Sequence, residues 1–351
     1  MMNLFESLFR MLGFWGLLLA VTATVGAAET GEQHKLARQL FDEGNFQEAL
    51  TAYAQVLENN SADTAHLVAS VERALQCYQQ LNRLQETDGF LAATAKTHAD
   101  NWQVLAAIAQ STMNQVHFGS LIAGEFQRGV QRGDSGKIVN SEARDHVRAL
   151  QLFRQAFELL AARTEEQKSP EAFTFLQNFA IAILRGNDTS QAWRLQELTD
   201  LSTLPDYEEG WNRRFGSTTG APVDAEGNPV FYELATSWDT AKNDGERWRW
   251  VLAETVKWQP QRRAYELATR AEFLLSQFGV QTLVEYGWWF GRQEVSGDAM
   301  GDDAKETGTF ALHTLTDQET IARLATGIER FTLPDEHNYI CLLYTSPSPR
   351  D

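Results

Sequence analysis

Residues 36–57 read LARQLFDEGNFQEALTAYAQVL, and this stretch decides the fold. Apolar residues recur every three or four positions on both sides of Gly44, which predicts two short antiparallel helices joined at that glycine. Glycine suits the position where the first helix must turn back, because it adopts positive φ at little cost. A single helix pair of this size cannot bury its own apolar faces, so we expect its neighbours to be stacked copies. The residues expected to be buried are Ala37, Leu40, Phe41, Phe46, Ala49, Leu50, Tyr53, Val56 and Leu57.

The spacing in this stretch resembles the tetratricopeptide repeat, a helix–turn–helix unit of about 34 residues. The resemblance implies a mainly α fold: a tetratricopeptide-like α-solenoid of antiparallel helix pairs, here with a glycine-rich insertion and a small β-hairpin excursion. Ser61 stands where that family has a terminal proline. The matching positions are Leu36, Ala37, Gly44, Phe46, Ala49 and Tyr53.

Helical periodicity continues over residues 64–84 and 88–97, and Trp102 opens a further repeat-like helix. The partner of that helix is expected only around Phe153, farther along the chain than in a regular repeat, where the spacing of small and aromatic residues seen in the first unit recurs. We therefore predict an insertion at about residues 116–141 between the two helices of this unit.

The insertion is rich in glycine, carries Arg128 and Arg132, and ends at Ser141, which has the position of a helix N-cap. A glycine-rich insertion in a helical array more often shapes a surface loop, and such loops bind partners. The two arginines are therefore candidate partner-binding residues. The alternative is that they pair with neighbouring carboxylates of this acidic chain.

Helices expected from Pro170 and over residues 191–204 complete a repeat region that spans residues 29–205. The periodicity breaks over residues 206–237, where the alternation around Glu226-Gly227-Asn228 predicts a small hairpin. A second helical region is expected over residues 238–340. Its predicted helices span residues 245–258, 262–278, 280–292 and 316–331.

The two ends of the chain are predicted to lie outside the folded part. Residues 1–28 have the pattern of a secretory signal peptide, with Arg10 before a short apolar run and small residues after it. We expect export to the cell envelope, the periplasm or the medium, and an uncleaved membrane anchor is the alternative. Residues 341–351, CLLYTSPSPRD, resemble a translated transposon adapter from sequencing libraries. We therefore expect a non-native tail and a chain that is the N-terminal part of a longer protein.

Composition and motifs argue against several kinds of activity. The chain of 351 residues has a formal net charge of −17, which disfavours binding to nucleic acid. The seven histidines are scattered, and no zinc-binding, phosphate-binding or serine-hydrolase motif is complete. We expect no catalytic residues, no cofactor and no metal. Cys77 is expected to be a buried helical thiol.

Tryptophans are concentrated in the second half of the chain. At helical spacing such residues fill a core more often than they form a carbohydrate-binding platform, although the platform stays an alternative. They are Trp211, Trp248, Trp250, Trp258, Trp288 and Trp289.

A set of short strings spans most of the chain after the signal: AGEFQRG at 123–129, AWRLQ at 192–196, LPDYEEGW at 204–211, GAPVD at 220–224, NDGERWRW at 243–250, QFGVQT at 277–282, GTFALHTL at 308–315 and ETIARLATGI at 319–328. Together these strings resemble the helical region that follows the signal peptide in large exported alpha-macroglobulin-like proteins of bacteria. In that family the helical repeats precede β-sandwich domains, and some members trap proteases through an internal thioester. The resemblance implies no active site in this segment, and the elements of a trap are expected elsewhere.

The leading hypothesis is a non-catalytic scaffold that positions or docks a larger exported alpha-macroglobulin-like protein. A regular first unit would project His34, Arg38 and Asp42 into the concave groove of the repeats, where a protein or peptide partner binds. The rest of the same longer chain is a second expected partner. The alternatives are a stand-alone envelope adaptor that binds peptides and a glycan-active envelope enzyme.

Overall fold

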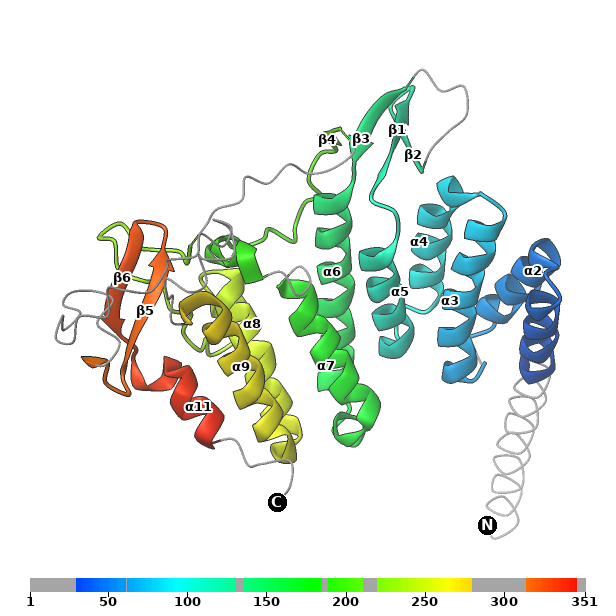
Figure 1. Cartoon of the computed structure of the whole chain (residues 1–351). Coiled ribbons are helices and arrows are strands. Elements are labelled where there is room, and N and C mark those ends of the chain that lie inside the picture. Colours follow the sequence, from blue (N-terminus) through cyan, green and yellow to red (C-terminus); the bar gives the residue numbers. More distant parts are fainter. Residues whose placement is uncertain are drawn as a thin grey trace, which may run out of the picture. The chain divides into compact units, whose positions relative to one another are not determined.

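The computed structural model describes residues 30–60, 62–129, 136–184, 189–210, 220–279 and 314–345 (Figure 1). This part of the chain is mainly helical, with small antiparallel sheets. The chain divides into two compact units, Met1–Thr164 with Leu201–Arg213 and Glu165–Asp200 with Arg214–Asp351. The division at Thr164 falls inside the span 29–205 that the sequence assigned to one repeat region. The expected signal peptide, residues 1–28, lies outside the described residues.

The first unit contains the helices that periodicity predicted before residue 164. A helix over residues 30–42 comes first. It is followed by α2 (Phe46–Glu58), α3 (Thr64–Gln80), the short η1 (Leu84–Glu86), α4 (Thr87–Thr97), α5 (Trp102–Asn114) and α6 (Glu142–Ala161). Helix α2 packs on α3, α3 packs on α5, and α5 packs on α6.

The reversal at Gly44 has the geometry predicted for it. Gly44 has φ of +81°, its N–H donates to the carbonyl of Phe41, and the N–H of Asn45 donates to the carbonyl of Leu40. This pair of hydrogen bonds is the Schellman motif, which satisfies the last carbonyls of a helix. Tyr53 is fully buried, as the sequence predicted, and Phe46 packs at the edge of the same cluster.

The insertion is a sheet rather than the predicted loop. Its strands are β1 (Phe118–Ile122), β2 (Glu125–Arg128) and β3 (Lys137–Asn140), and β4 (Glu208–Glu209) completes the antiparallel order β2-β1-β3-β4. Ala123 and Gly124 have φ of +51° and +86° and join β1 to β2. Two consecutive positive φ values are typical of the tight hairpin turn whose twist matches that of the strands.

Ser141 is the N-cap residue of α6, as predicted, but its side chain does not cap the helix. The Asn140 side chain accepts the first hydrogen bond instead, from the N–H of Glu142 at 2.7 Å.

The second unit is built on three long helices, α7 (Pro170–Ile183), α8 (Asp244–Trp258) and α9 (Arg263–Phe278). Pro170 stands at the start of α7 as predicted, and Ser169 caps that helix. The core includes Phe179 stacked on Trp238 with ring centroids 5.1 Å apart. The remaining described elements are η2 (Glu166–Lys168), η3 (Thr189–Gln196), η4 (Trp238–Thr240), η5 (Pro260–Arg262), β5 (Glu319–Leu324), β6 (Gly327–Thr332), η7 (Asp335–His337) and α11 (Tyr339–Thr345).

Two expectations about residues 191–237 are met only in part. The helix predicted over 191–204 is a short 3₁₀ segment, η3, that ends at Gln196. The hairpin predicted around Gly227 is a tight turn with one antiparallel bridge between Val223 and Pro229. The Asp224 carboxylate accepts from the N–H groups of Glu226 and Asn228 and holds this turn.

The helix predicted over residues 316–331 is wrong, because this stretch forms the β5–β6 hairpin. The same apolar residues fit a strand. Ile321 is fully buried there, and the Thr320 hydroxyl donates to the carbonyl of Phe278 at 2.6 Å. Ala221 pairs with the free edge of β5 at Leu324. These partners come from distant parts of the sequence, so local periodicity did not identify them. The helix predicted over 280–292 lies outside the described residues.

Helix α11 continues from Tyr339 to Thr345 and therefore crosses Ile340, where the predicted native part ends. Leu342 is buried, and α11 packs on α9.

Candidate functional site

A groove lies between α3 and α5 in the first unit, two helices that pack on each other. Its volume is about 430 Å³, within the range of ligand-binding clefts. We call it the amide groove. It is lined by Glu72, Leu75, Gln76, Gln79, Leu84, Thr87, Gln110, Ser111, Asn114, Gln115 and Val116.

The polar lining of the amide groove consists largely of side-chain amides. Among the described residues, the side chains of Gln79, Gln110 and Asn114 have no hydrogen-bond partner. Each amide offers both donors and an acceptor, so these three groups are available to a ligand that has both. Leu75 and Leu84 supply apolar surface beside them.

Gln115 joins the lining of the groove to its surroundings. Its amide oxygen lies 3.3 Å from the Thr87 hydroxyl, which donates to the carbonyl of Leu84, and its amide nitrogen lies 3.5 Å from the Asp88 carboxylate. Asp88 in turn accepts a hydrogen bond from Arg128 at 2.7 Å. The lining of the groove is therefore adjacent to a buried ion-pair centre.

That centre is built around Arg128 of β2 and Asp145 of α6. The two arginine Nη atoms donate to the two carboxylate oxygens at 2.8 and 3.0 Å, and the side chains are only 1% and 2% exposed. Burial alone would raise the pKa of Asp145, but hydrogen bonds from His117 and Arg128 outweigh it and hold that pKa below its ordinary value. Arg128 also donates to the carbonyl of Val116, which lines the groove. The centre thus ties the inserted sheet to the helices.

Ser141, His117 and Asp145 meet at this centre, but not in the order that nucleophilic catalysis requires. The Ser141 hydroxyl donates to Asp145 at 2.7 Å, and His117 Nδ1 lies 2.9 Å from the same carboxylate oxygen. His117 Nε2 faces the carbonyl of Met113 at 3.0 Å. A catalytic serine must contact the imidazole that removes its proton. Here the serine contacts the acid, so the group does not have the arrangement of a nucleophilic triad.

Three of the residues predicted to bind a partner, His34, Arg38 and Asp42, lie on the helix over 30–42, and Arg128 lies in the inserted sheet. Arg128 is buried in its ion pairs, so the alternative interpretation of that residue, pairing with carboxylates, is confirmed. Arg132 lies outside the described residues. On the helix over 30–42, Arg38 and Asp42 are exposed, with 3.9 Å between Arg38 Nε and Asp42 Oδ2. His34 stacks on His66, with ring centroids 4.4 Å apart. None of the five lines the amide groove.

The sequence analysis missed the groove amides because glutamine and asparagine carry no motif. The available signal is their spacing, since Gln76 and Gln79 are three residues apart and Gln110 and Asn114 are four apart. Such pairs fall on one face of a helix.

Cys77 is fully buried, as predicted, and burial raises the pKa of its thiol to about 11. The expectation that this segment lacks the Cys-x-x-Gln spacing of an internal thioester is wrong, because Gln80 follows Cys77 at that spacing. Both residues lie in the continuous helix α3, with Cys77 buried and Gln80 exposed. Cys77 is a free thiol here.

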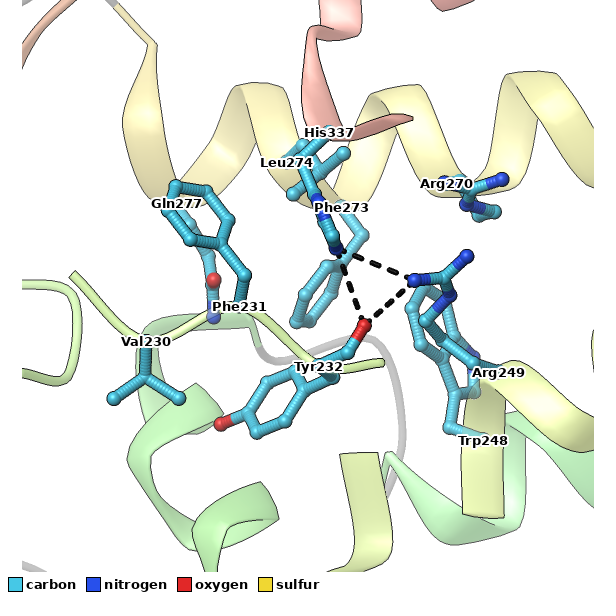
Figure 2. Close-up of a pocket in the computed structure, with 10 residues that line it drawn as sticks. All are labelled: Val230, Phe231, Tyr232, Trp248, Arg249, Arg270, Phe273, Leu274, Gln277 and His337. Carbon is cyan, nitrogen blue, oxygen red and sulfur yellow. Dashed lines mark hydrogen bonds between the residues drawn. The ribbon is translucent and has the colours of Figure 1, made fainter. Parts of the chain in front are cut away.

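A second, much smaller cavity lies in the second unit (Figure 2). Figure 2 shows Arg249 and His337 converging on the backbone carbonyl of Tyr232, with Arg249 Nη1 at 2.8 Å and His337 Nε2 at 3.2 Å from that oxygen. The cavity volume is about 10 Å³, which is room for a single water molecule. Its charged groups therefore serve the packing of this unit.

The tryptophans of the second unit that the structure describes do not form an open platform. Trp248 and Trp250 are buried, and Trp258 is half-buried. Trp211, Trp288 and Trp289 lie outside the described residues.

Within the described ranges, no group of three or more His, Cys, Asp or Glu side chains is arranged to hold a metal ion. None of the helices in the described part of the chain combines the length and the apolar character needed to cross a membrane. Comparisons with protein-family models, with curated proteins and with solved structures give no match to this chain.

Proposed function

We propose that this chain is a non-catalytic interaction protein whose first unit binds an extended polypeptide segment in the amide groove. The observation that carries the proposal is the set of three unpartnered amides, Gln79, Gln110 and Asn114, beside apolar side chains in one cavity. An extended backbone presents N–H and C=O groups that these amides satisfy, and its side chains contact the leucines.

The dimensions of the groove suit a short segment. Glu72 and Gln79 are seven residues apart on α3, which is about 10 Å along the helix axis. An extended chain rises about 3.3 Å per residue, so roughly three residues span that distance. A groove of this kind recognises the backbone of a bound segment more than the identity of its side chains. It therefore suits a scaffold that holds one defined stretch of a partner.

The wider proposal is that the helix pairs form a tetratricopeptide-like solenoid in an exported alpha-macroglobulin-like protein. Support comes from the first helix pair and from the repeat spacing in the sequence. Binding of a polypeptide is the same activity whether the chain serves a larger exported protein or a stand-alone envelope adaptor. Glycan binding is less well supported, because the lining of the groove includes no aromatic side chain on which a sugar ring would stack.

The experiment measures binding of the full chain to fluorescent nine-residue peptides of serine and alanine with blocked ends, by fluorescence anisotropy. The double variant Gln110→Ala/Asn114→Ala removes two of the free amides. At about 0.5–1.5 kcal/mol per hydrogen bond we expect the affinity to fall by roughly tenfold.

The matched control is Gln39→Ala, which removes an exposed amide from the helix over 30–42, where the Gln39 side chain donates to Glu43 at 2.8 Å. This variant should bind like the wild type. Equal affinities for all three proteins would contradict the proposal.

A further inference from the structure

The amide groove has an asymmetric charge. Glu72 is the only ionisable side chain among its described lining residues. It is exposed, and no cation in the described part of the chain pairs with it. The carboxylate is therefore available to a ligand.

Two charged side chains near the groove have partners within the protein. Asp88 forms an ion pair with Arg128 at 2.7 Å, an arginine that it shares with Asp145. Arg73, next to Glu72 on α3, donates to Gln76 at 3.0 Å, and its guanidinium lies over the ring of Phe41 at 4.8 Å. Neither side chain is part of the lining. Among the described lining residues, a ligand in the groove therefore meets one carboxylate, Glu72, and no cationic side chain.

We infer that the groove takes an internal, extended peptide segment that carries a lysine or arginine opposite Glu72. The inference rests on the proposed function and specifies its ligand. A cationic side chain complements the unpaired carboxylate, whereas an acidic side chain or a free carboxyl terminus would be repelled. The net charge of −17 on the chain adds a long-range attraction for such segments.

Glu72 is also well placed to define the position of the basic residue. It is the first lining residue along α3, and Leu75, Gln76 and Gln79 follow it. The basic side chain is therefore expected at one end of the bound segment. An apolar side chain one or two residues away would lie over Leu75 or Leu84, and the free amides would hold the backbone between them.

The test uses three blocked nine-residue peptides that differ at one central position, which holds lysine, norleucine or glutamate. Their affinities for the full chain are measured by anisotropy at low salt. Exposed ion pairs are worth about 0.2–1 kcal/mol, so the lysine peptide should bind about two- to fivefold more tightly than the norleucine peptide, and the glutamate peptide more weakly. Glu72→Gln should abolish the difference, and Glu72→Lys should reverse the order. Glu48→Gln, an exposed carboxylate on α2, is the matched control and should change nothing.

The outcomes separate the inference from the function on which it rests. If all three peptides bind the wild type equally, or if the lysine preference persists in Glu72→Lys, the charge inference is wrong while the groove stays a peptide site. If none of the peptides binds, the proposed function itself fails.

Discussion

Arg128 is the residue on which the architecture of the first unit depends most. It joins β2 to α6 through Asp145 and to α4 through Asp88, and it is almost completely buried. A buried charge without its partner is costly, because neither water nor a counter-ion compensates it. The arginine therefore has a structural role that an exposed basic residue of the same insertion could not have.

Arg128→Met should lower the free energy of unfolding by about 3–5 kcal/mol, because Asp145 is left as an uncompensated buried charge. Urea denaturation followed by circular dichroism measures the change. The matched control is Lys137→Met in the same sheet, whose ion pair with Glu209 is exposed on both sides. This control should stay within about 0.5 kcal/mol of the wild type. A loss equal to that of the control would show that the Arg128 pair is dispensable.

His34 links stability to pH. Burial, then His66, then Arg38 lower the pKa of this imidazole below its ordinary value of 6.5. The folded state therefore favours the neutral form of His34. The stability that His34 contributes is fully present above pH 6.5 and is lost as the pH falls below 6.5 towards the lowered pKa. We expect His34→Gln to lose less unfolding free energy than the wild type between pH 7.5 and 5.5.

The pKa of His337 is also lowered, mainly by burial, and this contribution to the pH dependence is the same in both proteins. The difference between them therefore reports His34 together with its interaction with the stacked His66. Urea denaturation at the two pH values provides the measurement. An identical pH dependence in the two proteins would rule out this role of His34.

At the scale of elements, local periodicity predicted the helices and failed for the strands. The Gly44 reversal and the helices α5 to α9 follow from apolar spacing and capping residues within each segment. The β5–β6 hairpin depends on Phe278 and Ala221, which are distant in sequence. The inserted sheet depends likewise on β4, 68 residues beyond the end of β3 (208 − 140). The groove depends on the packing of α3 against α5 and on the side chains that line it, and the repeat spacing predicted neither.

Two glycines give a matched test of the inserted sheet. A Cβ on Gly119 would lie 2.1 Å from the carbonyl oxygen of Gln127, whereas a Cβ on Gly89 in α4 would meet nothing within 4 Å. Gly119→Ala should therefore destabilise the fold by about 1–3 kcal/mol, because backbone of β2 must move. Gly89→Ala should stabilise it by about 0.4–1 kcal/mol, because alanine favours the helix. Thermal unfolding compares the two, and a neutral Gly119→Ala would contradict the close approach of the strands.

At the scale of the whole molecule, each unit has its own core and one of them carries the candidate site. The amide groove belongs entirely to the first unit, and its Glu72 has the same sign as the net charge of −17. Composition alone predicted an acidic, non-nucleic-acid-binding surface. The sequence could not locate the groove, because its polar groups are neutral amides that become a site only when two helices place them together.

The central claim is that the groove binds the backbone of an extended polypeptide. It is tested most directly by comparing a blocked nine-residue peptide with the same peptide N-methylated at its three central residues. Methylation removes three N–H donors and leaves the side chains unchanged. Affinities for the full chain are measured by anisotropy, and we predict at least a tenfold weaker affinity for the methylated peptide. The affinity of the unmethylated peptide should also fall when it is measured with the variant Gln110→Ala/Asn114→Ala. Equal binding of the two peptides would contradict the account.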